Sequence, residues 1–112
     1  MAVAGATGKL GSVVVRLVDE ADDLELVAAL DSQSSLTEML GADVLVDTTI
    51  PGVSQRIVDF AVDNDLSVVV GTSGWSAARI AELEARVRGR EGVGVAVIPT
   101  MGLFSLMFPV DP

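Results

Sequence analysis

Five short apolar segments alternate with stretches of helical periodicity along this 112-residue chain. Apolar residues that recur every three or four positions line one face of a helix, whereas short unbroken apolar runs are typical of buried strands. This alternation predicts a single α/β domain with a Rossmann-like, doubly wound parallel sheet of about five strands. The expected strands are residues 1–4, 24–30, 43–47, 67–70 and 93–98, and the expected helical segments are 9–21, 36–40, 51–64 and a helix that begins after Ser76 and ends at Gly89 or Gly92. The run LELVAAL at 24–30 predicts a strand that is buried on both faces.

Composition narrows the function classes that such a domain can serve. Half of the residues are hydrophobic, which favours a packed core, and the formal net charge of −9 disfavours nucleic acid, since phosphates are bound by clustered Lys and Arg. The chain has no Cys, His or Tyr, which excludes thiolate chemistry, His-ligated metal sites and Ser-His-Asp catalysis within it. It shows neither a run of roughly 18 apolar residues nor a secretory signal, so we expect no membrane partner and a cytoplasmic location.

Three glycines follow the first apolar segment at every third position, in GATGKLG from Gly5 to Gly11. A glycine-rich turn between a strand and a helix lets a pyrophosphate approach the N–H groups at the helix N-terminus. The spacing differs from G-x-G-x-x-G, because Ala6 stands where the first glycine of that pattern would be. Asp31 ends the second expected strand, where a carboxylate can accept hydrogen bonds from an adenosine ribose. The alternatives are a glycine turn with no ligand and a solvated acid at a strand end.

Two further loops are expected at the carboxyl ends of strands, DTTIPG at 47–52 and GTSGW at 71–75. Their small side chains and close backbone groups suit a nicotinamide, although ordinary turns have a similar composition. The carboxyl ends of parallel strands meet at one edge of the sheet, so these loops and the glycine loop predict a dinucleotide site there. We interpret Trp75 as a packing residue beside the start of a helix.

The stretches VAGATGKLG, ELVAALD, VLVDTTIPG, VVVGTSGW and AVIPT resemble, in order and spacing, the N-terminal domain of the 4-hydroxy-tetrahydrodipicolinate reductase (dihydrodipicolinate reductase) family. The resemblance covers roughly residues 1–99 and implies an NAD(P)-binding Rossmann domain there, with an atypical tail at 100–112. It implies an oxidoreductase of lysine and diaminopimelate biosynthesis that uses NADH or NADPH. The cofactor-binding residues that it implies are Gly5, Ala6, Thr7, Gly8, Lys9, Leu10, Asp31, Gly71, Thr72, Ser73, Ile98, Pro99, Thr100 and Met101. The family typically has Asn-Phe where this chain has Thr100-Met101.

The resemblance implies a second domain with a His-His pair, a catalytic Lys and a Ser-Gly-Thr stretch, of which the last binds the carboxylates of the substrate, and this sequence has none of them. We therefore expect no catalytic residue in the chain, no turnover by the chain alone, and substrate binding only if a second domain is supplied. The family's homo-oligomer is expected to be lost without that domain. A truncated or frame-disrupted gene product would account for the tail, and a trimmed chain would account for it less well.

NADH is expected to bind at least as well as NADPH, because Asp31 would repel a 2′-phosphate and no Arg follows it in the sequence. Lys9 is then the nearest cation, and Arg16 and Arg56 are expected on helices away from the strand ends.

Two other functions remain as alternatives to the reductase domain. The first is an NmrA-like or epimerase-like redox sensor, which GATG also suggests. A short-chain dehydrogenase or epimerase needs Tyr-x-x-x-Lys, and the chain has no Tyr. The second alternative is a domain that folds but binds no dinucleotide.

Overall fold

The computed structural model describes residues 1–72 and 74–97, and these residues form a parallel sheet in the strand order β2-β1-β3-β4-β5. All four strand pairings are parallel. The arrangement confirms the expected Rossmann-like α/β fold. The strands are β1 (Ala2–Ala4), β2 (Ala28–Leu30), β3 (Val44–Asp47), β4 (Ser67–Val70) and β5 (Val95–Val97).

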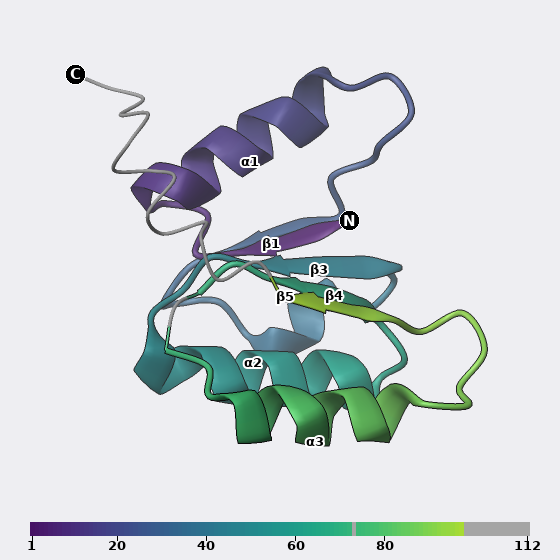
Figure 1. Ribbon diagram of the computed structural model, residues 1–112. Coiled ribbons are helices and arrows are strands. Elements are labelled where there is room, and N and C mark those ends of the chain that lie inside the picture. Colours follow the sequence, from purple (N-terminus) through teal and green to yellow (C-terminus); the bar gives the residue numbers. More distant parts are fainter. Residues whose placement is uncertain (73, 98–112) are drawn as a thin grey trace.

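Helices cover both faces of the sheet, as a doubly wound fold requires (Figure 1). Helix α1 (Lys9–Glu20) lies on one face, and α2 (Pro51–Asp63) and α3 (Ala77–Val87) lie side by side on the other. A short 3₁₀ helix, η1 (Leu36–Met39), packs near β2 and α2. The N-termini of α2 and α3 carry residues that are favoured at helix starts. Pro51 occupies the first turn of α2, and the Ser76 hydroxyl accepts the Arg79 N–H of α3.

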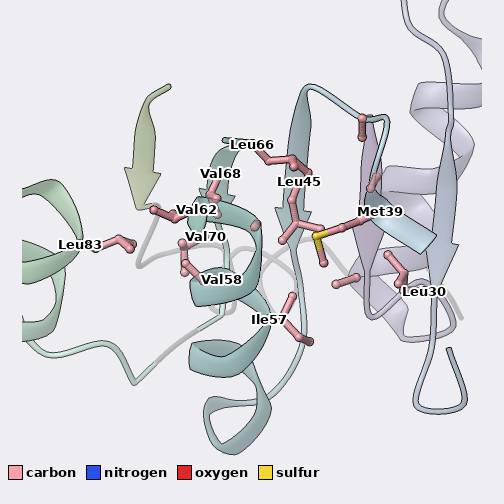
Figure 2. Close-up of a cluster of buried hydrophobic side chains, with 14 residues drawn as sticks. Leu30, Met39, Leu45, Ile57, Val58, Val62, Leu66, Val68, Val70 and Leu83 are labelled. Atoms are coloured by element: carbon pink, nitrogen blue, oxygen red, sulfur yellow. The ribbon is translucent and has the colours of Figure 1, made fainter. Parts of the chain in front are cut away.

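The main hydrophobic core lies between the sheet and the face that carries η1, α2 and α3. Alternate strand residues such as Leu45, Val68 and Val70 point to this face, because successive side chains of a strand point to opposite sides. Figure 2 shows Val58 and Val62 of α2 beside Val68 and Val70. Each such side chain contributes about 1.5–3 kcal/mol when it is fully buried. This core fixes the position of α2, and therefore of the loop that precedes it.

The expectation for residues 24–30 is wrong in extent, because β2 contains only Ala28–Leu30. The side chains of Leu24 and Val27 are 43% and 40% exposed, so this run is not buried on both faces. The reason is the neighbouring strand: β2 is an edge strand whose partner β1 pairs Ala2 with Ala28. The assigned strand therefore begins at Ala28, although Met1 continues the main-chain pairing through hydrogen bonds with Glu25 and Val27.

The carboxyl ends of the strands lie in register across the sheet. Ala4 of β1 is aligned with Leu30 of β2 and with Asp47 of β3, and Asp47 is aligned with Val70 of β4. The loops that follow these strands therefore leave the sheet side by side at one edge. Within the described ranges, no helix is long and apolar enough to span a bilayer, and no three acidic side chains are grouped as metal ligands.

Candidate functional site

A pocket of about 340 Å³ opens at the carboxyl ends of β1, β2 and β3. It lies at the topological switch point of the sheet, where β2 and β3 flank β1 on opposite sides. Ligands of open α/β sheets bind in the crevice at this point. The pocket is lined by Ala4, Gly5, Thr7, Gly8, Leu30, Asp31, Ser32, Ser34, Leu36, Thr48, Thr49, Ile50, Val53, Arg56 and Ile57.

Gly5 and Gly11 are required by the close packing of the loop between β1 and α1. Gly5 has a φ of +81°, and a Cβ added to it would lie 2.7 Å from the Thr48 carbonyl oxygen. A Cβ added to Gly11 would lie only 1.8 Å from the Gly5 carbonyl oxygen. The first turn of α1 thus rests directly on the loop, which brings the helix N-terminus to the pocket.

Gly8 has a different environment from the other two glycines. It is the exposed N-cap residue of α1, and the nearest atom to an added Cβ would be the Gly5 carbonyl oxygen at 3.4 Å. A side chain at Gly8 would therefore leave the packing intact, at a position that lines the pocket. The first hydrogen bond of α1 runs from the Ser12 N–H to the Gly8 carbonyl, so the N–H groups of residues 9–11 precede it. With no acidic residue in this turn, the positive end of the helix dipole is available to an anion.

Asp31 follows β2 directly and lies on the rim of the pocket. The loop of residues 31–34 orients its side chain. Its Oδ1 accepts the Gln33 N–H at 2.8 Å and the Ser34 hydroxyl at 3.3 Å, while the Asp31 N–H donates to the same hydroxyl at 3.0 Å. Within residues 1–72 and 74–97, Oδ2 makes no hydrogen bond. A carboxylate that is held by one oxygen can use the other to accept a hydroxyl of a ligand.

A buried hydrogen-bond network centres on Asp47, the last residue of β3, which is fully buried. Its Oδ1 accepts the N–H of Thr49 at 3.2 Å and the hydroxyl of Thr49 at 2.5 Å. Its Oδ2 accepts the hydroxyl of Thr72 at 2.8 Å and the hydroxyl of Ser54. The indole N–H of Trp75 donates to the Ser54 hydroxyl at 2.8 Å. The network joins the loop after β3, the first turn of α2 and the loop after β4.

This network stabilises loop geometry rather than presenting side chains to a ligand. The Thr72 side chain is buried, and its hydroxyl also lies 3.0 Å from the Thr49 carbonyl oxygen that accepts it. Every buried side-chain polar atom in the described part of the chain has a partner. Buried polar networks of this kind rigidify a structure when every member is satisfied. Trp75 packs against the core, as the sequence predicted, and in addition donates this hydrogen bond.

The structure brings some of the predicted site residues together and separates others. Gly5, Thr7, Gly8 and Asp31 line the pocket. Ala6, Lys9 and Leu10 belong to the same loop and first helical turn without lining it, and Gly71 and Thr72 are buried at the end of β4. The remaining predicted residues lie outside the described part of the chain: Ser73, Ile98, Pro99, Thr100 and Met101.

Sequence reasoning also placed one residue wrongly and missed another. Arg56 was expected away from the strand ends, but it lines the pocket. The reason is that α2 begins at Pro51, four residues after the end of β3, so its second turn still borders the switch point. Asp47 was expected only as the residue where a strand meets the loop that follows it, and not as the centre of a hydrogen-bond network. An acid that ends a buried strand and precedes Thr48 and Thr49 is the signal that could have identified the network.

Comparison with known proteins supports a single family. The sequence profile described as "Dihydrodipicolinate reductase, N-terminus" matches residues 1–101. The chain is 49% identical over 107 residues to a 4-hydroxy-tetrahydrodipicolinate reductase from Clavibacter sepedonicus, covering 96% of this chain and 39% of that protein. It is 36% identical to the reductase of the same name from Corynebacterium efficiens, covering 94% of this chain and 43% of that protein. The chain thus spans less than half the length of these relatives.

A solved structure has the same fold. Dipicolinate-bound dihydrodipicolinate reductase from Paenisporosarcina sp. TG-14 superposes with a TM-score of 0.77 at 22% sequence identity. The superposition covers 95% of this chain and 49% of that one. At this identity the likeness concerns the fold, and it agrees with the parallel strand order described above.

Proposed function

The chain belongs to the dihydrodipicolinate reductase N-terminal family, and we propose that it is the NADH- or NADPH-binding domain of a 4-hydroxy-tetrahydrodipicolinate reductase. The observation that carries the proposal is the position of Gly8. It lies at the N-terminus of α1 and lines the switch-point pocket. Packing alone does not require a glycine there, whereas a ligand that approaches the backbone would. Asp31 lies on the rim of the same pocket, after the neighbouring strand.

The residues of the pocket fit a dinucleotide. In the proposal, the N–H groups in the first turn of α1 bind the pyrophosphate, and Asp31 accepts hydrogen bonds from the adenosine ribose. The Asp47 network holds the loop after β4, where the segment from Gly71 to Ser73 would face the nicotinamide. When bound, NADH or NADPH supplies the hydride that a reductase transfers. We assign this role to a domain of residues 1–99, and the alternative of a redox sensor is not favoured by the family match.

The reaction of the whole enzyme is part of the proposal, since the chain spans 39% of the Clavibacter sepedonicus relative. We propose hydride transfer to a cyclic dicarboxylate in lysine and diaminopimelate biosynthesis, with the dicarboxylate bound by a further domain. The chain has no His and no Tyr to donate a proton. Positioning of the acceptor against the donor accounts for several kcal/mol of the barrier in such reactions. The chain alone is therefore expected to bind the cofactor without turnover.

A titration with NADH tests the proposal on the protein as it is. Gly8→Asp places a carboxylate where the pyrophosphate would lie, so NADH affinity should fall at least tenfold. Its stability should hold or rise, because Asp is a preferred N-cap residue and Gly8 makes no side-chain cap. Gly94→Asp is the matched control, since it adds the same charge just before β5, where an added Cβ meets no atom within 4 Å. Equal NADH affinity for the wild type and Gly8→Asp, measured by calorimetry, would refute the site.

A further inference from the structure

Among the residues that the structure describes, Arg56 is the one basic residue that lines the pocket. It lies in the second turn of α2, one turn after Val53, and both residues line the pocket together with Asp31. Asp31 reaches the pocket from the end of β2, whereas Arg56 reaches it from the helix that follows β3. One acidic and one basic residue therefore border the same cavity from two different elements.

The electrostatic surroundings leave the Arg56 charge unneutralised. Asp59 is one turn further along α2 and would be its natural partner, but Asp59 instead accepts a hydrogen bond from Arg86 at 2.6 Å. Arg90 likewise pairs with Asp65. In the described part of the chain, Arg56 forms neither a salt bridge nor a side-chain hydrogen bond, although the sequence contains 16 acidic residues. An unpaired guanidinium beside a pocket favours an anionic ligand group.

The rest of this end of the pocket suits an adenosine. Leu36 of η1 and Val53 and Ile57 of α2 line the pocket and supply an apolar surface for a flat base. Ser32 and Ser34 add hydroxyl groups next to Asp31. A ribose whose hydroxyls reach Asp31 would direct its 2′ position along this rim, where the negative charge of Asp31 disfavours a phosphate unless a cation offsets it.

We infer that Arg56 is the specificity-determining residue that binds the 2′-phosphate of NADPH, so that the pocket accepts NADPH despite Asp31. A guanidinium binds phosphate oxygens through paired, charge-assisted hydrogen bonds, and its long side chain adjusts to the ligand. NADH lacks this phosphate and makes no use of the interaction. The inference rests on the proposed dinucleotide function and goes beyond it, because it assigns the choice between the two cofactors to a residue of α2.

Calorimetric titration of the 112-residue chain with NADH and NADPH tests the inference in the absence of turnover. Arg56→Gln is expected to weaken NADPH about tenfold, which corresponds to about 1.4 kcal/mol, and to change NADH less than threefold. Arg56→Lys should retain most of the NADPH affinity, because it keeps the charge. Arg88→Gln is the matched control, since it removes an exposed Arg at the C-terminal end of α3, at the opposite edge of the sheet.

A second pair of ligands separates the 2′-phosphate from the rest of the cofactor. The wild type should bind 2′,5′-ADP more tightly than 5′-AMP, and Arg56→Gln should abolish the difference. The difference should also shrink as salt is raised, because an exposed ion pair is screened. If Arg56→Gln lowered the affinity for NADH and NADPH equally, Arg56 would contact a part that both cofactors share, and the inference would be overturned. It would also be overturned if neither affinity changed. If the wild type bound neither cofactor, the proposed function would fall as well.

Discussion

The loop after β1 and the loops after β3 and β4 meet at the same edge of the sheet, but they are built from opposite kinds of residues. The first depends on Gly5 and Gly11, whose missing side chains let the backbone of α1 pack on the loop. The other two are joined by side chains around the buried Asp47 carboxylate, which accepts hydrogen bonds from Ser54 and Thr72. One region is defined by close backbone packing and the other by satisfied polar groups.

The difference shows which groups each region leaves for a ligand. The glycine loop uses the N–H groups of Gly5, Ala6 and Gly8 internally, so the donors that it leaves for a ligand are those of residues 9–11, which precede the first hydrogen bond of α1. The Asp47 network uses its hydroxyl and indole donors internally, so it contributes position rather than ligand contacts. Changes in the network should therefore reduce stability first, and changes on the pocket side of the glycine loop should reduce binding first.

The largest stability effect is expected for Asp47→Ala. It removes the acceptor that the Thr72 and Ser54 hydroxyls share and leaves the buried Ser54 hydroxyl without an acceptor, at a cost of about 3 kcal/mol. The free energy of unfolding from urea denaturation measures this loss. Asp43→Ala, an exposed acid just before β3, is the control and should change it by less than about 0.5 kcal/mol. Similar values for the two variants would mean that the network does not determine the position of the loops.

Gly11→Ala should have the next largest effect, and it should lower both the stability of the fold and the affinity for NADH. The new Cβ would lie 1.8 Å from the Gly5 carbonyl oxygen, so the loop must shift, at a cost of about 2 kcal/mol of stability. NADH affinity should fall with it, because the N-terminus of α1 moves away from the pocket. Gly52→Ala, in the first turn of α2 with no atom within 4 Å of its added Cβ, should instead leave stability unchanged or slightly raised. Unchanged stability of Gly11→Ala would contradict the close packing.

Asp31→Asn should change the affinity for NADH and the affinity for NADPH differently, with almost no effect on stability. The amide oxygen can still accept the Gln33 N–H, so the unfolding free energy should change by less than about 0.5 kcal/mol. The loss of charge should weaken NADH several-fold and leave NADPH unchanged or tighter, as read by fluorescence titration. Asp23→Asn, in the exposed turn after α1, is the control for net charge. An equal loss of affinity for both cofactors would contradict the expectation that Asp31 lies near the 2′ position of the ribose.

Arg86→Gln should have the smallest effect. Arg86 joins α2 and α3 through Asp59 and Asp63, and the hydrogen bond to Asp59 is the main reason that its pKa is raised. Both acidic partners are exposed, so the pairs contribute about 1 kcal/mol or less, and high salt should reduce the contribution further. NADH affinity should stay the same, because these residues do not line the pocket at β1. A large loss of binding would show that the site depends on the α2–α3 contact.

The sequence predicted what depends on local periodicity and turn chemistry. The five strands, the three main helices and the strand–loop–helix position of Gly5 and Gly11 were all foreseen, because each follows from short-range spacing. The extent of β2 was not, because it is limited by the length of β1, a neighbour distant in sequence. The same holds for Arg56 and for the partners of Asp47, which lie on elements whose contacts only the assembled sheet defines.

The most direct test of the account is an NMR titration of the ¹⁵N-labelled 11.6 kDa chain with NADH, followed through its backbone amide signals. The account predicts that the largest shifts fall on the amides of Gly5, Gly8 and Leu10 and on Asp31, while those of α3 barely move. Shifts centred on α3, or none at millimolar NADH, would contradict a dinucleotide site at the switch point between β1, β2 and β3.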